Sequence, residues 1–376
     1  MERDELSAWL RLTLTPGIGS SSARRLLAAF GLPSEIYRQS RAALEQLVDA
    51  AAAQALHHEP EGLVELLNTT WDWLQAAPGA HAVVTLGDPR YPASLLTIED
   101  PPPLLYLKGR LDLPLDANRS LAVVGSRNPT PQGELNARQF SQALGEAGLT
   151  IVSGLALGID GAAHAGALAG HARHPDGLAT VAVVGTGLDR VYPRRHHALA
   201  HAIAAQGLLL SEYPLGTPPL AHNFPRRNRL IAGLSCATLV VEAALESGSL
   251  ITARLAAEQG KDVLAIPGSI HAAQSRGCHA LIRQGAKLVE SAQDVLEELP
   301  AWANQEVAAV TPPAPPGTAT DDNLLDAMGM DPVSLDALQA RTGLGIAPLQ
   351  ARLMTLELDG QVARLPGGLL QRLVRG

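Results

Sequence analysis

The central part of the chain alternates between short apolar runs and longer amphipathic stretches. The apolar runs are rich in β-branched residues, which favours strands. They fall at 121–124, 150–152, 181–184, 208–210, 238–241, 263–266 and 287–289. Helical patterns separate several of them, at 133–146, 158–169 and 249–259. Apolar strands that alternate with helices predict a parallel sheet covered on both faces. We therefore expect 118–300 to form a Rossmann-like, doubly wound, mostly parallel α/β domain.

The segments before this domain have other patterns. Residues 1–80 are rich in Leu, Ala and Glu and predict a helical domain. A turn at 14–19 containing Gly17 and Gly19 precedes three serines, which we expect to cap the next helix. This resembles a helix-hairpin-helix or SAM-like element that grips DNA backbone, and an ordinary turn between packed helices fits equally well. Prolines crowd 81–117, so we expect an ordered extension without regular helix or strand pairing.

The segments after the central domain predict a linker and a small domain. Residues 301–322 are Pro-rich and predict an extended, semi-rigid linker. Residues 323–376 predict a winged-helix domain. Its expected elements are helices at 323–328, 334–341 and 348–358 and a hairpin of 361–365 with 369–373. The second and third helices carry few basic residues, which favours a protein-interaction role over DNA binding.

Charge changes this picture only locally. The formal net charge is −8, which by itself disfavours a nucleic-acid-binding protein. Residues 118–300, however, contain 15 basic and 14 acidic residues, so the excess of acid lies in the flanking segments. The basic residues are 26 Arg and only 3 Lys. The positions at which arginines gather therefore matter more than the total charge.

Metal, disulfide and membrane sites are not expected. Cys236 and Cys278 lack CxxC spacing, and the histidines lack zinc-like spacing, which indicates a reducing compartment and no metal. The charged N-terminus is unlike a secretory signal, and no apolar run reaches the ~18 residues of a membrane span. We expect a cytoplasmic protein.

Glycine- and serine-rich turns follow the first three predicted strands. Ligands bind at the carboxyl ends of strands in open parallel sheets, so these turns are candidate binding elements. They contain Gly125, Ser126 and Arg127, then Ser153 and Gly154, then Gly185 and Thr186. Small residues leave room near the backbone, whose N–H groups suit phosphate oxygens, and Arg127 adds a bidentate donor. The alternative is that the turns need small residues only for packing.

A basic segment with one aromatic residue precedes a predicted helix. It contains Asn223, Phe224, Arg226, Arg227, Asn228 and Arg229. This combination offers phosphate neutralisation, hydrogen bonds and a ring on which a base can stack. The alternative is a solvated loop in which Phe224 fills the core and the arginines pair with acidic neighbours.

Enzyme chemistry is less well supported. In the dinucleotide fingerprint that begins at Gly185, Arg190 stands at the third glycine position, and the chain has no Walker-type motif. His164 fits a packed histidine better than a base, and Glu242 is expected to hold backbone N–H groups of the turn that follows it. We expect no cofactor and no catalysis. The alternatives are a phosphoribohydrolase-like nucleotide enzyme, which lacks its usual Pro-Gly-Gly segment here, and a protein scaffold.

Several motifs resemble the DNA-processing protein A (DprA/Smf) family. The similar stretches lie at 123–127, 152–160, 185–193, 211–214, 224–235, 240–243, 247–253 and 266–268. The resemblance implies a basic pocket for single-stranded DNA lined by Arg127, Arg226, Asn228 and Arg229, with Phe224 as the stacking ring. It also implies a homodimer through the Rossmann domain and loading of the RecA recombinase in natural transformation and possibly repair.

The chain departs from the family pattern at two places. Histidine stands where the family usually has Asn, at His196 or His197 and at His279. The expected pocket is also poor in lysine, so Arg190, Arg194 and Arg195 are predicted to supply the charge that lysines give elsewhere.

Overall fold

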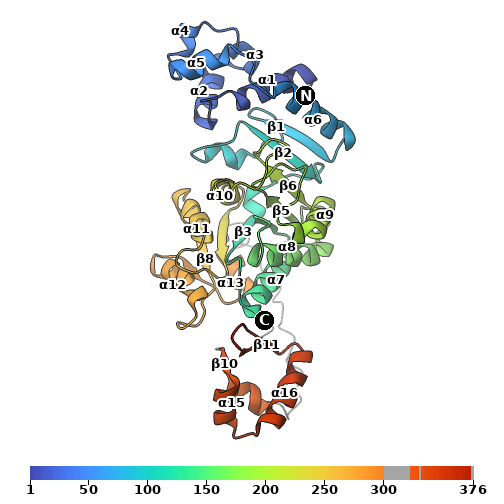
Figure 1. The fold of residues 1–376 in the computed structure, drawn as a ribbon, viewed down its shortest axis with the longest axis vertical. Coiled ribbons are helices and arrows are strands. Elements are labelled where there is room, and N and C mark those ends of the chain that lie inside the picture. The colour runs from blue at the N-terminus through green and yellow to red at the C-terminus, as the bar shows by residue number, and fades with distance from the viewer. Residues whose placement is uncertain (300–321, 330–331, 374–376) are drawn as a thin grey trace.

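A parallel sheet forms the centre of the protein (Figure 1). The computed structural model describes residues 1–299, 322–329 and 332–373. Seven parallel strands run in the order β6-β5-β4-β3-β7-β8-β9 within a nine-stranded sheet of the described residues. Their bounds are β3 (Ser120–Val124), β4 (Thr150–Ser153), β5 (Thr180–Val183), β6 (Leu208–Ser211), β7 (Ala237–Val240), β8 (Asp262–Ala265) and β9 (Lys287–Leu288). The predicted Rossmann-like fold class is confirmed.

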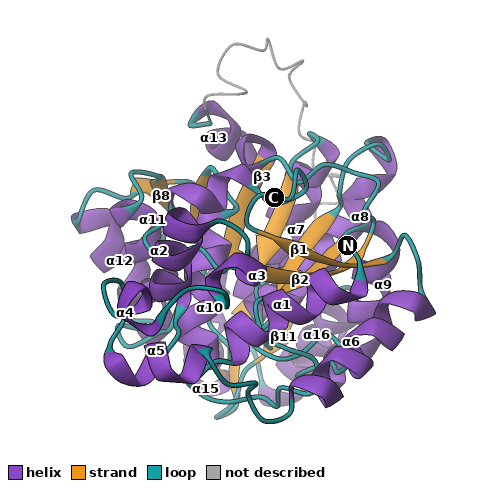
Figure 2. Cartoon of the chain, turned by 90° about the horizontal axis from the view of Figure 1, so that it is seen from above, coloured by secondary structure: helices purple, strands orange, loops and turns teal. Residues whose placement is uncertain are grey.

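Helices cover both faces of this sheet (Figure 2). They are α7 (Pro131–Glu146), α8 (Ile159–Gly170), α9 (His197–Gln206), α10 (Asn223–Gly233), α11 (Ser249–Glu258), α12 (Arg276–Arg283) and α13 (Ala292–Glu297). Alternate residues of β3 enter different cores: Leu121 and Val123 pack with α7, α8 and α13, whereas Ala122 and Val124 pack with α10, α11 and α12. This two-sided burial explains why the strands are apolar throughout.

The order of the strands creates one switch point. From β3 the chain adds β4, β5 and β6 on one side, then crosses back to add β7, β8 and β9 on the other. The carboxyl ends of β3 and β7 are therefore neighbours whose following segments diverge. Ligands of doubly wound sheets bind at such a crevice.

The Pro-rich extension contributes two strands, contrary to our expectation. β1 (His81–Thr85) pairs antiparallel with β2 (Leu104–Gly109), and β2 pairs antiparallel with β6. Pairing is possible because no proline lies inside either strand: Pro114 follows β2, and the other prolines fall in the connection at 86–103, which includes the short helix η1 (Ala93–Thr97). Tyr106 at the middle of β2 is fully buried.

Six helices precede the sheet. They are α1 (Arg3–Leu14), α2 (Ser20–Phe30), α3 (Pro33–Ile36), α4 (Arg41–Leu44), α5 (Ala50–Leu56) and α6 (Leu63–Ala76). Gly17 makes the turn between α1 and α2 with φ +80°, and a side chain there would press on Ala52. The expected serine cap is wrong: Gly19 is the N-cap, because Ser20 already lies inside α2 and is buried. The helix-hairpin-helix interpretation stays a prediction.

The C-terminal segment forms the predicted winged-helix domain. Its helices are α14 (Asp322–Met328), α15 (Leu335–Thr342) and α16 (Ile346–Leu358), and its strands are β10 (Val333–Ser334), β11 (Val362–Arg364) and β12 (Leu369–Arg372). The sequence pattern missed β10, which has only two residues. The predicted linker at 301–322 lies outside the described residues except for the residue that begins α14. In the part of the chain that the structure describes, no helix is long and apolar enough to cross a membrane.

Candidate nucleic-acid interface

A pocket of about 390 Å³ opens at the switch point between β3 and β7. The turn at 125–128 after β3 forms one wall, and the segment 246–252, which leads into α11, forms another. Phe224, Pro225 and Asn228 of α10 close it. The sequence predicted the first and third walls. It missed the second, although the Ser-Gly-Ser at 247–249 between a strand and a helix is a signal for a helix start.

Glu242 anchors the turn that carries Arg127. Its carboxylate accepts hydrogen bonds from Thr130 N at 2.9 Å and Thr130 Oγ1 at 2.6 Å. Thr130 is also the N-cap of α7 and accepts from Gly133 N. Glu242 therefore holds the turn after β3, whereas it was predicted to hold the turn that follows Glu242 itself. The reason is that β7, which Glu242 follows closely, is paired with β3, so the carboxylate lies next to the turn after β3. Burial raises the pKa of Glu242, and the Thr130 bonds partly oppose this shift.

The basic segment at 223–229 is the first part of α10 rather than a loop before a helix. Pro225 does not prevent this, since proline is accepted in a first helical turn. Helical geometry then separates the side chains by face: Phe224 and Asn228, four residues apart, reach the switch-point pocket. Asn228 also donates from Nδ2 to Gly248 O at 3.4 Å, which links α10 to the start of α11.

Arg226 and Arg229 lie on another face of α10 and do not line this pocket, contrary to prediction. Arg229 donates to both carboxylate oxygens of Glu212, at 2.5 and 2.6 Å, and from Nε to Asp100 O at 2.9 Å. The Asp100 carboxylate lies 3.6 Å from Arg229 and 3.8 Å from Arg226. Arg229 is 11% exposed, whereas Arg226 is 50% exposed.

Arg227 points into the protein. Its guanidinium donates to Gly154 O at 2.6 Å and to Val183 O, and its side chain is buried. Burial lowers the pKa of Arg227 to about 10, while Asp160 opposes the shift. A Cβ on Gly154 would collide with this guanidinium. The room expected at Gly154 is therefore filled by Arg227.

The other predicted turn residues are also engaged internally. A Cβ on Gly185 would contact Phe224 at 3.2 Å, and Gly185 O accepts from Asn223 Nδ2 at 2.9 Å. Ser153 is buried and donates to Val123 O at 2.6 Å. Thr186 is buried, and its carbonyl accepts from the Ser211 hydroxyl. These residues make contacts inside the protein beneath the carboxyl edge of the sheet and do not line the pocket, whereas Gly125 and Ser126 do line it.

The loop after β5 brings further cations to the same edge. Arg190 pairs with Asp189 at 3.0 Å. Arg194 and Arg195 lie on the exposed 3₁₀ turn η4 (Arg194–His196). His196, one of the two histidines considered for the first departure from the family pattern, lies with Nδ1 3.1 Å from Leu155 O and so ties this loop to the turn after β4.

The seven predicted arginines thus fall into two groups. Four are engaged: Arg190 and Arg226 in exposed ion pairs, Arg229 in a largely buried one, and Arg227 with backbone carbonyls. Arg127, Arg194 and Arg195 are exposed, and within the described ranges no hydrogen bond or ion pair holds their guanidinium groups. These three follow β3 and β5, at the carboxyl edge of the sheet, and are free to meet an anion.

Two buried or edge histidines are accounted for by packing. His164 is fully buried and lies with Nδ1 2.7 Å from Thr180 Oγ1, as a packed histidine should. Burial lowers its pKa to about 3. His279 Nε2 lies 2.9 Å from Gly268 O. Among the described residues, no three His, Cys, Asp or Glu side chains are grouped so that they could hold a metal ion.

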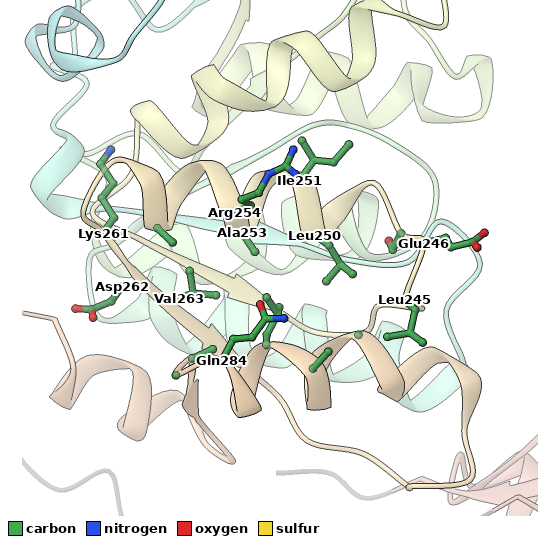
Figure 3. A pocket seen from close by; sticks show the side chains of 17 residues that line it. Leu245, Glu246, Leu250, Ile251, Ala253, Arg254, Lys261, Asp262, Val263 and Gln284 are labelled. Carbon is green, nitrogen blue, oxygen red and sulfur yellow. The ribbon is translucent and has the colours of Figure 1, made fainter.

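A second groove, of about 620 Å³, lies between α11 and α12 (Figure 3). It shares Glu246, Ser247 and Ile251 with the switch-point pocket. Leu250 and Leu281 belong to its apolar lining, and its charged residues are two acids and two bases: Glu246, Asp262, Arg254 and Lys261. The acids and bases that line this groove are therefore equal in number.

Comparison with known proteins places the whole α/β domain in one family. Residues 82–300 match DNA recombination-mediator protein A, and 308–368 match the DprA winged helix domain. The chain is 42% identical over 294 residues to protein Smf of Escherichia coli K12, covering 77% of this chain and 76% of that protein.

Two solved structures are similar. DNA processing protein A from Streptococcus pneumoniae has a TM-score of 0.66 and 37% identity, over 80% of this chain and 98% of that chain. The Helicobacter pylori protein, described for its single-stranded DNA binding mode, has a TM-score of 0.51 and 31% identity, over 57% and 93%. From its domains and its relatives, the chain belongs to the DNA recombination-mediator protein A (DprA) family.

Proposed function

We propose that this protein is a non-enzymatic recombination mediator that binds single-stranded DNA along the carboxyl edge of its sheet. The observation that carries the proposal is the exposed, unpaired state of Arg127, Arg194 and Arg195 at that edge, among the residues that the structure describes. Cations without an internal partner release counterions when they meet phosphates, which is the main source of affinity for nucleic acid.

The switch-point pocket supplies the remaining contacts in this proposal. Arg127 and the positive end of α11 face one phosphate, and Asn228 positions it. Phe224 provides a ring for an unstacked base. Arg226 contributes at the margin, because its pairing with Asp100 is long and exposed. Arg227, Arg229 and Asn223 act indirectly, by holding α10 against the sheet.

A preference for single strands follows from this chemistry. Stacking on Phe224 requires a base that has left its helix, and a duplex does not offer one without unpairing. Backbone contacts from arginines and helix ends read no sequence, so modest sequence preference is expected.

Family membership supports a proposal about the partners. We propose that the protein works in the cytoplasm as a homodimer through its Rossmann-like domain and loads the RecA recombinase onto DNA in natural transformation or repair. Light scattering should give twice the chain mass, and addition of the protein should speed RecA assembly on single-stranded DNA. A monomer without effect on RecA would contradict this part.

The winged-helix domain is proposed to bind a protein rather than DNA. The exposed residues of α16 include Ile346 at 52%, Met354 at 61% and Leu358 at 80% exposure, and the helix contains one basic residue, Arg352. The N-terminal helices fit either a role in binding the DNA backbone or a purely structural role.

The test compares a labelled single-stranded oligonucleotide with its duplex by fluorescence anisotropy over a range of salt. The proposal predicts tighter binding of the single strand and an affinity that falls with salt. Equal affinity for both forms, or no binding near physiological salt, would sink it.

A further inference from the structure

We propose that Tyr192 is a second base-stacking ring, which forms a two-ring platform with Phe224. The inference rests on the proposed function and extends it, since that function assigns stacking to Phe224 alone. The two ring centroids are 5.6 Å apart, and the ring planes are inclined by 41°. Tyr192 is 47% exposed and is the one aromatic residue among the exposed large hydrophobic residues of the described ranges.

The position of the platform on the edge supports this assignment. Tyr192 follows β5 and precedes η4, so the two unpaired cations Arg194 and Arg195 come directly after it. Phe224, which packs against Tyr192, lines the switch-point pocket that contains Arg127. Each ring therefore neighbours one group of cations, Tyr192 along the chain and Phe224 through the pocket lining. Stacking rings beside cations that meet phosphates are the arrangement that nonspecific single-strand binding uses.

The Tyr192 hydroxyl makes no hydrogen bond to any residue in the described ranges. Its ring also lines a narrow apolar cleft with Leu155, Val184 and Leu188. A purely structural role would therefore depend on apolar volume, which leucine can supply, whereas stacking needs a flat aromatic face. Leucine and phenylalanine substitutions separate the two roles.

The experiment measures binding of a fluorescent single-stranded oligonucleotide by wild type, Tyr192→Phe and Tyr192→Leu. The platform predicts wild-type affinity for Tyr192→Phe and about tenfold weaker binding for Tyr192→Leu, with the salt dependence unchanged. An abasic oligonucleotide of the same length keeps the phosphates and lacks the bases, so all three proteins should bind it equally.

The melting temperature of each variant provides the control for folding. Equal affinities of Tyr192→Leu and Tyr192→Phe for the normal oligonucleotide would overturn the platform, and so would an equal loss on the abasic strand. If the wild type binds no single strand at all, the proposed function fails and the platform with it. If the wild type binds and Arg127→Ala weakens it while Tyr192→Leu does not, only the platform fails.

Discussion

Arg229 and Glu212 form a two-point ion pair, with Nη1 to Oε1 at 2.5 Å and Nη2 to Oε2 at 2.6 Å. The side chains are 11% and 7% exposed. Glu212 directly follows β6, and Arg229 lies in the second turn of α10, so the pair fastens the helix that carries Phe224 to the sheet. Arg229, which the sequence predicted to bind phosphate, therefore holds α10 in position.

Replacing Arg229 should therefore affect stability more than DNA affinity. Arg229→Ala leaves the Glu212 carboxylate buried without its partner, and we expect a loss on the order of 3 kcal/mol in the free energy of unfolding, measured with urea. Arg229→Met combined with Glu212→Leu should recover much of that loss, because it removes both charges. A stable Arg229→Ala protein whose salt dependence of binding drops as in Arg127→Ala would show instead that Arg229 contacts DNA.

Asp100 should weaken DNA binding in the wild type. Its carboxylate lies 3.8 Å from Arg226, which is half exposed, and so competes with phosphate for that cation. Asp100→Asn should raise the affinity for a single-stranded oligonucleotide several-fold at low salt, and the gain should vanish at high salt.

Asp112→Asn is the matched control for this change. Asp112 pairs with Arg110 at 2.7 Å just after β2, at the opposite end of the sheet from Asp100, which precedes β2. Its replacement should leave affinity unchanged. An equal gain in both variants would mean that net charge alone sets the binding, without a role for Arg226.

His164 should make the fold sensitive to acid. Burial lowers its pKa from the usual 6.5 to about 3 in the folded protein, so the unfolded chain binds more protons between these values. Stability contributed by the neutral ring is complete above about pH 6.5 and is lost as the pH falls toward 3.

His164→Asn tests this without removing the hydrogen bond. Thr180 Oγ1 donates to Ile151 O, so it accepts from Nδ1 of His164, and an asparagine amide can take that place. The melting temperature of His164→Asn should fall less between pH 7 and pH 4 than that of the wild type. Parallel acid profiles for the two proteins would exclude His164 as the cause.

The sequence predicted the sheet well because its strands are buried on both faces and therefore read as continuous apolar runs. It failed for β1 and β2, where nearby prolines suggested an unpaired extension although the strands themselves contain none. It also failed for the start of α10, which begins at Asn223 and so includes the basic segment that was expected to precede the helix.

The site was predicted by residue type but not by partner. The sequence states which positions are basic, but it does not state what they pair with, because the partners of Arg229 lie 17 and 129 residues away in the chain. Only the fold reveals that Arg229 pairs with Glu212 and Asp100, whereas Arg127 has no such partner among the described residues. The aromatic pair was missed for the same reason, since Tyr192 and Phe224 meet only when the loop after β5 reaches α10.

The central claim is that three unpaired arginines bind the phosphates of single-stranded DNA. The most direct measurement is the dependence of log affinity on log salt concentration for the wild type and for Arg127→Ala combined with Arg194→Ala and Arg195→Ala. Each neutralised phosphate of a single strand contributes about 0.7 to the slope, so the triple variant should lose about 2. Arg138→Ala, which removes an exposed arginine in the middle of α7, should keep the wild-type slope. A triple variant that also keeps the wild-type slope would contradict the account.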